Sequence, residues 1–440
     1  MYRLIGLGAL GAFGLVGCKD RCNAEVSLGE DAGHSAMLVW DGGGDSATVA
    51  YSTDGDPGDR EGVVTSSGEG HTATLWGLPP LSEVRYSFTS DGESCEDTFT
   101  ASGLPSGLPT FATSSHDEDA AGSWRYIAGV AMGEVGSLFI IDREGRWRWH
   151  QVHDNEVNVS AVLLGVDGET MLYNSFDQDR TNDIGQVHTR SLLGDEVTDT
   201  RTEGAHHTFT QLPDGTIAFP SVDVRSWLDP DLDEEVDVVG DRILEIAPDG
   251  TVTEIWSIWD HEEPFKHDTW DSSFYGDLGQ DWTHGNALNY SPERGTYLFS
   301  LGHLDTIYEI DRTGEVLLRL TPDDIVSGTA YNFQHDPSWT DDGTLTLLSY
   351  PDDSPARAIE YAVSAEGTME ELWSYERDRS GTTLLGQVRR LPNGNTFISF
   401  GGMGEMREVT PEGEVVWQLN ASLGSWFGNA VLLDTLPSLP

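Results

Sequence analysis

Short apolar stretches that end in a glycine turn recur through most of this 440-residue chain. Each repeated unit has an apolar strand, a Pro/Asp/Asn-Gly turn and a return strand, and then two more strands joined by a second glycine turn. The second turn occurs six times at spacings of roughly 46 to 64 residues, with its glycines at Gly145, Gly194, Gly250, Gly314, Gly367 and Gly413. Six all-β units of this length are typical of propeller blades.

The two ends of the repeat region complement each other. The first unit lacks its opening strands, whereas an additional strand-like stretch, Trp426–Leu436, follows the last complete unit. A ring closes if this C-terminal stretch completes the first blade. The pattern therefore predicts a six-bladed β-propeller over residues 123–436. An array of β-sandwiches would explain neither the number of units nor the incomplete first one.

Residues 24 to about 102 have a simpler alternation of apolar and polar positions. The stretches that predict half-buried strands include Ala36–Trp40, Ala47–Tyr51 and Val84–Phe88. The segment Leu75-Trp-Gly-Leu78 followed by Tyr86 is similar to the Leu-turn-Tyr region of fibronectin type III domains. We therefore expect a small β-sandwich domain over residues 18–110, joined to the propeller by a Pro/Gly-rich and then polar connection.

Charge narrows the range of partners. Acidic residues outnumber basic residues 75 to 24, which gives a formal net charge of -51. Such a surface repels nucleic acid and anionic lipid, so we expect neither as a partner. The charge itself is interpreted as a solvated, solubilising surface. An anionic substrate would need a locally positive pocket.

The amino terminus predicts export and a lipid anchor. Arg3 precedes the apolar run Leu4–Val16, which is too short for a comfortable membrane span. The run leads into Leu15-Val16-Gly17-Cys18, which looks like a bacterial lipobox in which residues 1–17 are removed and Cys18 is lipidated. Lys19 after the cysteine favours the outer membrane, facing the periplasm or the cell surface. An ordinary signal peptide that contains a cysteine is the alternative.

The two remaining cysteines, Cys22 and Cys95, bracket the predicted sandwich domain. Export places them in an oxidising compartment, where a pair is more often a disulfide than a metal site. A Cys22–Cys95 bridge would tie the ends of the first domain together.

Three histidines occupy equivalent positions in three repeats: His207, His284 and His335. Each opens an apolar strand that leads to a glycine turn, and equivalent positions in a ring of repeats lie at equivalent points in space. Three imidazoles should therefore converge at the mouth of the central channel. For any one of these histidines, a structural role is the ordinary interpretation. A purely structural role is less convincing for three histidines at one repeat position with His206 beside them. A His₃ zinc site is an alternative, but nothing in the sequence fixes the partners of such ligands, and we expect no metal.

The surroundings of these histidines resemble bacterial PAPS-independent arylsulfotransferases. Asp281-Trp-Thr-His-Gly-Asn286, Tyr297-Leu-Phe-Ser-Leu-Gly-His303 and Ile307-Tyr-Glu-Ile-Asp311 look like that family's signature, and Phe333-Gln-His-Asp-Pro-Ser338 resembles its nucleophile motif. The resemblance spans roughly residues 125–435. The family is a six-bladed propeller with a small β-rich N-terminal domain, in line with the repeats.

The resemblance implies ping-pong transfer of a sulfuryl group from an aryl sulfate to a small phenol, without a cofactor. His335 would correspond to the nucleophile and form a transient sulfohistidine. His207 and His284 would bind the sulfuryl oxygens and exchange protons with the phenolic oxygens. His206 is a weaker substitute for His207. Asn286, counted with the substrate-binding group, is expected to orient the loop that bears His284.

His303 is a further candidate substrate-binding residue. The residue before it departs from the family's pattern. The family usually has an Arg there that holds the sulfuryl oxygens, and this chain has Gly302. A guanidinium supplies a fixed charge and paired donors, and the loss of such a donor typically costs about 100- to 1000-fold in rate. Arg389 and Arg390 are the candidates to take its place, although exposed charges on a strand are the ordinary interpretation of both.

Two other functions stay open. The departure at Gly302 and the anionic surface are also consistent with a non-catalytic envelope propeller that binds a ligand or acts as a scaffold. A different propeller enzyme, such as a lyase or hydrolase, could reuse the same histidines. The long insertion over residues 222–280 is a candidate lid over them. Within it, the acidic stretch Asp229–Glu235 lacks the spacing of a calcium loop, so a solvated insertion is the preferred interpretation.

Overall fold

The structure is a computed structural model, and it describes residues 24–29, 34–41, 47–54, 56, 58–67, 70–90, 93–132, 135–153, 158–177, 185–192, 196–231, 233–270, 274–351, 354–378, 385–422 and 424–437. The regular elements within these residues are β-strands and short 3-10 helices, which confirms the all-β expectation. No helix in this described part is long and apolar enough to cross a membrane.

The chain divides into two compact units, and the first comprises the residues up to Leu104 together with Trp147–Trp149. Its strands before Leu104 are β1 (Ala24–Leu28), β2 (Ala36–Trp40), β3 (Ala47–Thr53), β4 (Arg60–Glu61), β5 (Val63–Ser67), β6 (Gly70–Leu75), β7 (Glu83–Ser90) and β8 (Glu93–Thr100). They form two antiparallel sheets in the orders β1-β2-β6-β5 and β4-β3-β7-β8. Leu38, Leu75 and Val84, which come from both sheets, lie fully buried in one apolar core. The predicted β-sandwich is confirmed.

Cys95 on β8 is disulfide-bonded. Its expected partner Cys22 and the expected lipidation site Cys18 both lie outside the described residues. The Cys22–Cys95 pairing and the lipid anchor therefore stay predictions.

The second unit comprises Pro105–Arg146 and His150–Leu439. Six sheets, called blades A to F here, lie in its described part, except that strand β12 of blade A begins with Trp147–Trp149 of the first unit. Their strands are, for blade A, β35 (Trp426–Leu433), β10 (Tyr126–Met132), β11 (Ser137–Asp142) and β12 (Trp147–Val152); for blade B, β13 (Val162–Leu164), β14 (Thr170–Ser175), β15 (Gln186–Ser191) and β16 (Glu196–Arg201); for blade C, β17 (Thr210–Gln211), β18 (Ile217–Asp229), β19 (Glu234–Ile246), β20 (Val252–Ser257) and β21 (Gln280–Asp281); for blade D, β22 (Gly285–Ser291), β23 (Thr296–Leu301), β24 (Thr306–Asp311) and β25 (Val316–Leu320); for blade E, β26 (Ile325–Ser327), β27 (His335–Trp339), β28 (Leu345–Ser349), β29 (Arg357–Val363) and β30 (Met369–Glu376); and for blade F, β31 (Gln387–Arg390), β32 (Thr396–Phe400), β33 (Glu405–Val409), β34 (Val415–Ala421) and β9 (Phe111–His116).

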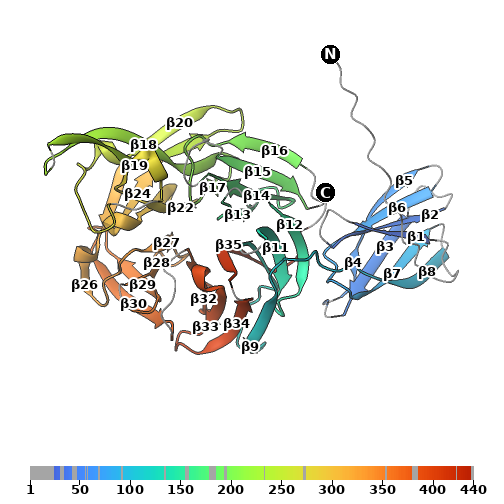
Figure 1. Ribbon diagram of the computed structural model, residues 1–440. Coiled ribbons are helices and arrows are strands. Elements are labelled where there is room, and N and C mark those ends of the chain that lie inside the picture. Colours follow the sequence, from blue (N-terminus) through green and yellow to red (C-terminus); the bar gives the residue numbers. More distant parts are fainter. Residues whose placement is uncertain are drawn as a thin grey trace, which may run out of the picture. The chain divides into compact units, whose positions relative to one another are not determined.

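The six sheets surround a common centre, and strands β13, β17, β22, β27 and β35 lie nearest to it (Figure 1). This arrangement is the predicted β-propeller. Short 3-10 helices occur between the strands: η1 (Ile258–Asp260), η2 (Gly276–Leu278), η3 (Gly302–Leu304), η4 (Pro322–Asp324) and η5 (Gly401–Met403).

Apolar side chains pack between neighbouring blades. One core joins Ile243 of blade C to Leu288 and Phe299 of blade D, and all three are at most 1% exposed. Because each sheet buries both of its faces in this way, its strands read as apolar runs rather than as a strict alternation.

The ring closes as the C-terminal stretch predicts. β35 pairs antiparallel with β10, with Leu433 opposite Tyr126. The propeller begins earlier in the chain than the predicted residue 123. Strand β9 pairs with β34 and adds a fifth strand to blade F. We expected a polar connection over residues 114–121, and His116 instead lies opposite Trp417 in this sheet. An outermost strand stays half exposed, so its polar residues carry no clear strand signal.

The turns set the positions of the histidines. Gly215 and Gly314, at two of the predicted turns, have φ of 86° and need the left-handed region that glycine tolerates. His207 and His335 each lie eight residues before the glycine of the next turn, whereas His284 lies eleven residues before Gly295. His335 is the first residue of β27, and His284 directly precedes β22, whereas His207 lies three residues before β17.

Candidate active site

Imidazole rings from several blades meet beside the starts of the innermost strands. The ring of His284 lies 4.8 Å from that of His207 and 4.4 Å from that of His303, measured between centroids. The Phe333 ring joins His335 to the group, at 5.7 Å from His284 and 5.3 Å from His335. The structure therefore brings together the repeat-equivalent histidines, and His303 with them.

The backbone is strained where it presents these side chains. His207 has φ of 53°, His284 has φ of 50° and Phe333 has φ of 42°. These values lie in the left-handed region, which costs a residue other than glycine about 1–3 kcal/mol and is enriched at functional sites. The strain lies shortly before β17, β22 and β27, at the histidine itself in the first two segments and two residues before His335 in the third, so each chain segment turns sharply where it delivers a ring to the cluster.

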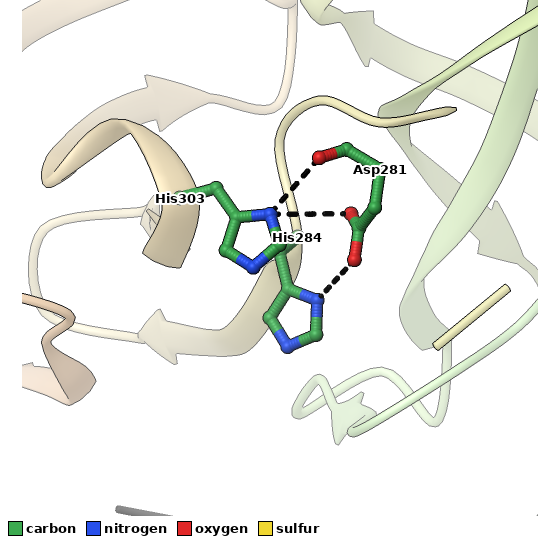
Figure 2. A group of neighbouring side chains, drawn as sticks. All are labelled: Asp281, His284 and His303. Carbon is green, nitrogen blue, oxygen red and sulfur yellow. Dashed lines mark hydrogen bonds and ion pairs between the residues drawn. The ribbon is translucent and has the colours of Figure 1, made fainter. Parts of the chain in front are cut away.

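Asp281 orients two of the imidazoles (Figure 2). Its Oδ2 lies 2.8 Å from Nδ1 of His284, and its backbone carbonyl lies 3.0 Å from Nδ1 of His303. Since carboxylate and carbonyl oxygens only accept hydrogen bonds, both Nδ1 atoms donate. In the neutral rings both Nε2 atoms then carry a lone pair. The two rings are stacked, with 16° between their planes.

Asp241 reaches the cluster through His206. Its Oδ1 lies 2.7 Å from Nε2 of His206, and Nδ1 of His206 lies 2.8 Å from Nδ1 of His207. The other carboxylate oxygen accepts hydrogen bonds from the Thr283 hydroxyl and the Gly285 amide, both at 2.6 Å. His206 and Asp241 are fully buried. His206 therefore stands behind His207 and does not replace it at the site.

His335 is held differently from the other histidines. Its Nδ1 lies 3.4 Å from the carbonyl oxygen of Phe333, so its partner among the described residues is a backbone group and not a carboxylate. The Tyr350 ring contacts it edge-on at 5.3 Å. A ring whose Nδ1 donates to a carbonyl offers Nε2 as a lone pair, which is the form a nucleophile needs.

Burial keeps several of these rings neutral. Burial, followed by the neighbouring His284, lowers the pKa of His335 to about 3 and that of His303 to about 4. The pKa of His207 is also held well below its usual value, first by burial and then by the other imidazoles. The charged form of each ring is therefore disfavoured at neutral pH.

Gly302 is closely surrounded, and its neighbours explain why the position is small. A Cβ at this position would lie 2.6 Å from Nδ2 of Asn286 and 3.2 Å from the Phe333 ring. The same Asn286 nitrogen donates a hydrogen bond of 2.9 Å to the Gln334 carbonyl. Asn286, the second residue of β22, thus ties this strand to the segment that carries His335.

Arg389 and Arg390 each pair with a carboxylate. Arg389 forms an ion pair with Asp336, the residue after His335. Arg390 pairs with Glu360 and donates a hydrogen bond of 2.6 Å to the Thr396 hydroxyl. Arg389 therefore pairs with the residue next to the nucleophile candidate, and its charge is offset by Asp336.

Several residues that shape the site had no role assigned from the sequence. The Phe274 ring stacks on His207 at 4.5 Å and lies 4.9 Å from His284. The Tyr275 ring lies 5.5 Å from that of His206. Both lie in the insertion between β20 and β21. The earlier part of the 222–280 stretch, which we expected to be an insertion, instead forms strands β18, β19 and β20 of blade C. Asp281 lies within the signature stretch, so the sequence drew attention to it. Nothing in the sequence pointed to Asp241, because its partner His206 is 35 residues away along the chain.

A metal ion is one further use of such a group. One ligand atom from each of Asp281, His284 and His303 lies within 4.8 Å of the others. Both Nδ1 atoms, however, are at hydrogen-bond distance from Asp281, and the stacked rings direct their Nε2 lone pairs side by side rather than toward one point. Ligands of one zinc ion converge tetrahedrally. The arrangement fits hydrogen-bonded imidazoles better than a metal centre.

A known protein family matches most of the chain. The sequence profile of the family described as Arylsulfotransferase (ASST) matches residues 115–422. No curated protein matches the chain. Solved structures that it resembles include a protein of unknown function from Bacteroides caccae, with 16% identity, 70% of this chain and 98% of that chain covered and a TM-score of 0.45. A catalytically inactive virginiamycin B lyase from Staphylococcus aureus, crystallised with quinupristin, has 11% identity, 74% and 100% coverage and a TM-score of 0.41.

Proposed function

Because the chain belongs to the arylsulfotransferase family, we propose that it transfers a sulfuryl group from an aryl sulfate ester to a phenolic acceptor. The observation that carries the proposal is the convergence of His207, His284 and His335 with their Nδ1 atoms engaged. This leaves the Nε2 atoms to act on one substrate. Such a set can supply a nucleophile and proton carriers without a cofactor.

The reaction divides into two half-reactions. Nε2 of His335 attacks the sulfur of the donor, an N–S bond forms, and the bond between sulfur and the aryl oxygen breaks. The aryl oxygen leaves as a phenol once it has received a proton. In the second half-reaction the acceptor phenol gives up a proton, its oxygen attacks the sulfohistidine, and the N–S bond breaks to restore His335.

The hydrogen-bond partners support this division of roles. His284 contacts the Asp281 carboxylate directly, and His207 is linked to the Asp241 carboxylate through His206. A carboxylate stabilises an imidazolium, so these rings suit proton transfer. His335 has a backbone carbonyl instead. Its low basicity suits a nucleophile that must later leave from sulfur.

The sulfuryl oxygens need donors that Gly302 does not supply. His284 is a candidate, because its Nε2 atom can take up a proton while its Nδ1 atom stays bonded to the Asp281 carboxylate. That carboxylate can offset one positive charge on the stacked pair. A charge-assisted N–H donor of this kind is stronger than a neutral one.

The proposed setting is the cell envelope. The lipobox ending at Cys18 supports export and attachment through a lipid anchor. In this setting the partners are small phenolic donors and acceptors, and the membrane is contacted through the anchor.

The test is an assay with p-nitrophenyl sulfate as donor and phenol as acceptor. We expect phenol-dependent release of p-nitrophenol by the intact protein and loss of this activity in His335→Ala. The matched control is His188→Ala, which removes a histidine that is hydrogen-bonded to Asp199 in blade B, outside the cluster. Unchanged donor consumption by His335→Ala would contradict the proposal.

A non-catalytic binding propeller is the second candidate, and the close packing around Gly302 favours it. Without a guanidinium, the site could hold an aromatic ligand between Phe274 and Phe333 and turn nothing over. Folded protein that binds phenols at the histidine cluster but transfers no sulfuryl group from any donor would favour this function.

A further inference from the structure

We propose that Asp241, His206 and His207 form a proton relay in which His207 alternates between acid and base while the positive charge resides on His206. This inference deepens the proposed function and rests on it. His206 and Asp241 are positioning residues here, because neither touches the substrate.

The geometry requires a single shared proton between the two histidines. Nδ1 of His206 and Nδ1 of His207 are 2.8 Å apart, so one of them donates and the other accepts. Nε2 of His206 lies 2.7 Å from Asp241, which can only accept when ionised. Nε2 of His206 therefore always carries its proton, and the proton between the Nδ1 atoms is the one that can move.

Two states follow from this arrangement. In the base state both rings are neutral, His207 donates its Nδ1 proton to His206, and Nε2 of His207 offers a lone pair. In the acid state His206 carries both protons and donates from Nδ1 to His207. Nε2 of His207 then carries a proton that it can give away. One proton taken up at Nε2 of His207, with one shift between the Nδ1 atoms, converts the first state into the second.

The surroundings place the charge on His206. Asp241 lies next to it, and its second oxygen is held by the Thr283 hydroxyl and the Gly285 amide, both at 2.6 Å. His207 instead adjoins His284 and the ring of Phe274. A buried cation is tolerated beside a hydrogen-bonded anion and disfavoured among other imidazoles.

The polar groups that face His206 fit both states. Besides Asp241 and His207, the Tyr275 hydroxyl lies 3.4 Å and 3.5 Å from its two ring nitrogens. These contacts are longer than the two bonds at 2.7 Å and 2.8 Å. The Tyr275 ring stands at 78° to the imidazole and closes off its face. The proton path therefore runs through the two short bonds.

The proton balance closes over the two half-reactions. The relay starts in the acid state and gives its Nε2 proton to the departing aryl oxygen, while the Nδ1 proton returns from His206 to His207. The enzyme then holds the sulfohistidine and a relay in the base state. The acceptor phenol gives its proton to Nε2 of His207, the Nδ1 proton moves back to His206, and the acid state is restored.

The first experiment varies how much the leaving group needs a proton. Phenolate, the conjugate base of an acid with a pKa of about 10, needs protonation far more than p-nitrophenolate does. In Asp241→Asn we expect transfer from phenyl sulfate to fall about 100-fold or more, and transfer from p-nitrophenyl sulfate to fall less than about 10-fold. Asp199→Asn, which removes a His188-bonded carboxylate in blade B, is the matched control. An equal loss with both donors, or no loss, would overturn the relay.

The second experiment does not depend on activity. ¹⁵N NMR of histidine-labelled intact protein reports which ring nitrogens carry protons, and single variants at His206 and His207 assign the signals. On acidification we expect His206 to become doubly protonated while His207 changes from the Nδ1–H to the Nε2–H form. If His207 instead becomes the doubly protonated ring, or keeps its tautomer, the relay is wrong. If this change occurs in protein that transfers no sulfuryl group, the proposed function fails and the relay stands.

Discussion

The ring of His284 stacks on that of His303, with centroids 4.4 Å apart, and Asp281 contacts both. Asp281 thus fixes the orientation of two imidazoles at the same end of blade D, that of His284 through its carboxylate and that of His303 through its backbone carbonyl. Replacing Asp281 with Asn keeps the size and removes the charge. We expect Asp281→Asn to lower the rate of sulfuryl transfer about 100-fold or more, measured by steady-state kinetics. Asp223→Asn, which removes a carboxylate paired with Arg225, should be nearly neutral.

The low pKa of His335 predicts a pH-dependent contribution to stability. The folded value is about 3 and the ordinary value is 6.5, so between these limits the unfolded chain binds a proton that the folded protein does not. The contribution of the neutral His335 ring to the free energy of unfolding is therefore complete above pH 6.5, and it is lost as the pH falls toward about 3. The difference in unfolding free energy between the wild type and His335→Gln should shrink by up to about 1.4 kcal/mol per pH unit in this window. Chemical denaturation at several pH values measures it, and a constant difference would contradict the assignment.

The space around Gly302 predicts that even a methyl group is costly there. In Gly302→Ala the added Cβ would displace Asn286 from its hydrogen bond with the Gln334 carbonyl. We expect a loss of about 1–3 kcal/mol in unfolding free energy, with lower activity because the His335 segment shifts. Gly58→Ala is the control, since nothing lies within 4 Å of its added Cβ. Equal thermal stability of the two variants would show that the site has room for a side chain.

Phe274 should hold the His207 ring in place and contact the substrate. Its ring stacks on the imidazole at 4.5 Å with 23° between the planes. A stacked pair is worth about 0.5–1.5 kcal/mol beyond its buried area, so Phe274→Leu should lower kcat/KM for p-nitrophenyl sulfate several-fold. Phe265→Leu removes an aromatic ring from the same insertion that is 50% exposed, and it should leave the rate unchanged. The same loss in both variants would assign the effect to the insertion as a whole.

The lipobox predicts a modified amino terminus. Cells that express the full chain should incorporate labelled palmitate into the wild type and not into Cys18→Ser. Mass spectrometry of the mature protein should find Cys18 as its first residue. A soluble protein with an unmodified amino terminus would favour the ordinary signal peptide instead.

The repeated architecture and the inner-strand positions of the histidines follow from the amino-acid pattern alone. Both features depend on residues that are close together in the sequence, because a few neighbouring residues suffice to determine a glycine turn with positive φ or a short apolar strand. The pattern therefore suffices to place His284 and His335 at the starts of β22 and β27. The polar residues of β9 concealed a strand, because pairing with β34 stabilises it from more than 300 residues away along the chain.

How each histidine is used depends on contacts that form only in the folded chain. Asp241 meets His206 across 35 residues, and Arg389 meets Asp336 across 53. Hydrogen bonds of this kind depend on distances of a fraction of an ångström between segments that the repeats bring together, and no local pattern encodes them. The sequence thus identifies the imidazoles, and the tertiary structure determines which nitrogen of each ring can react.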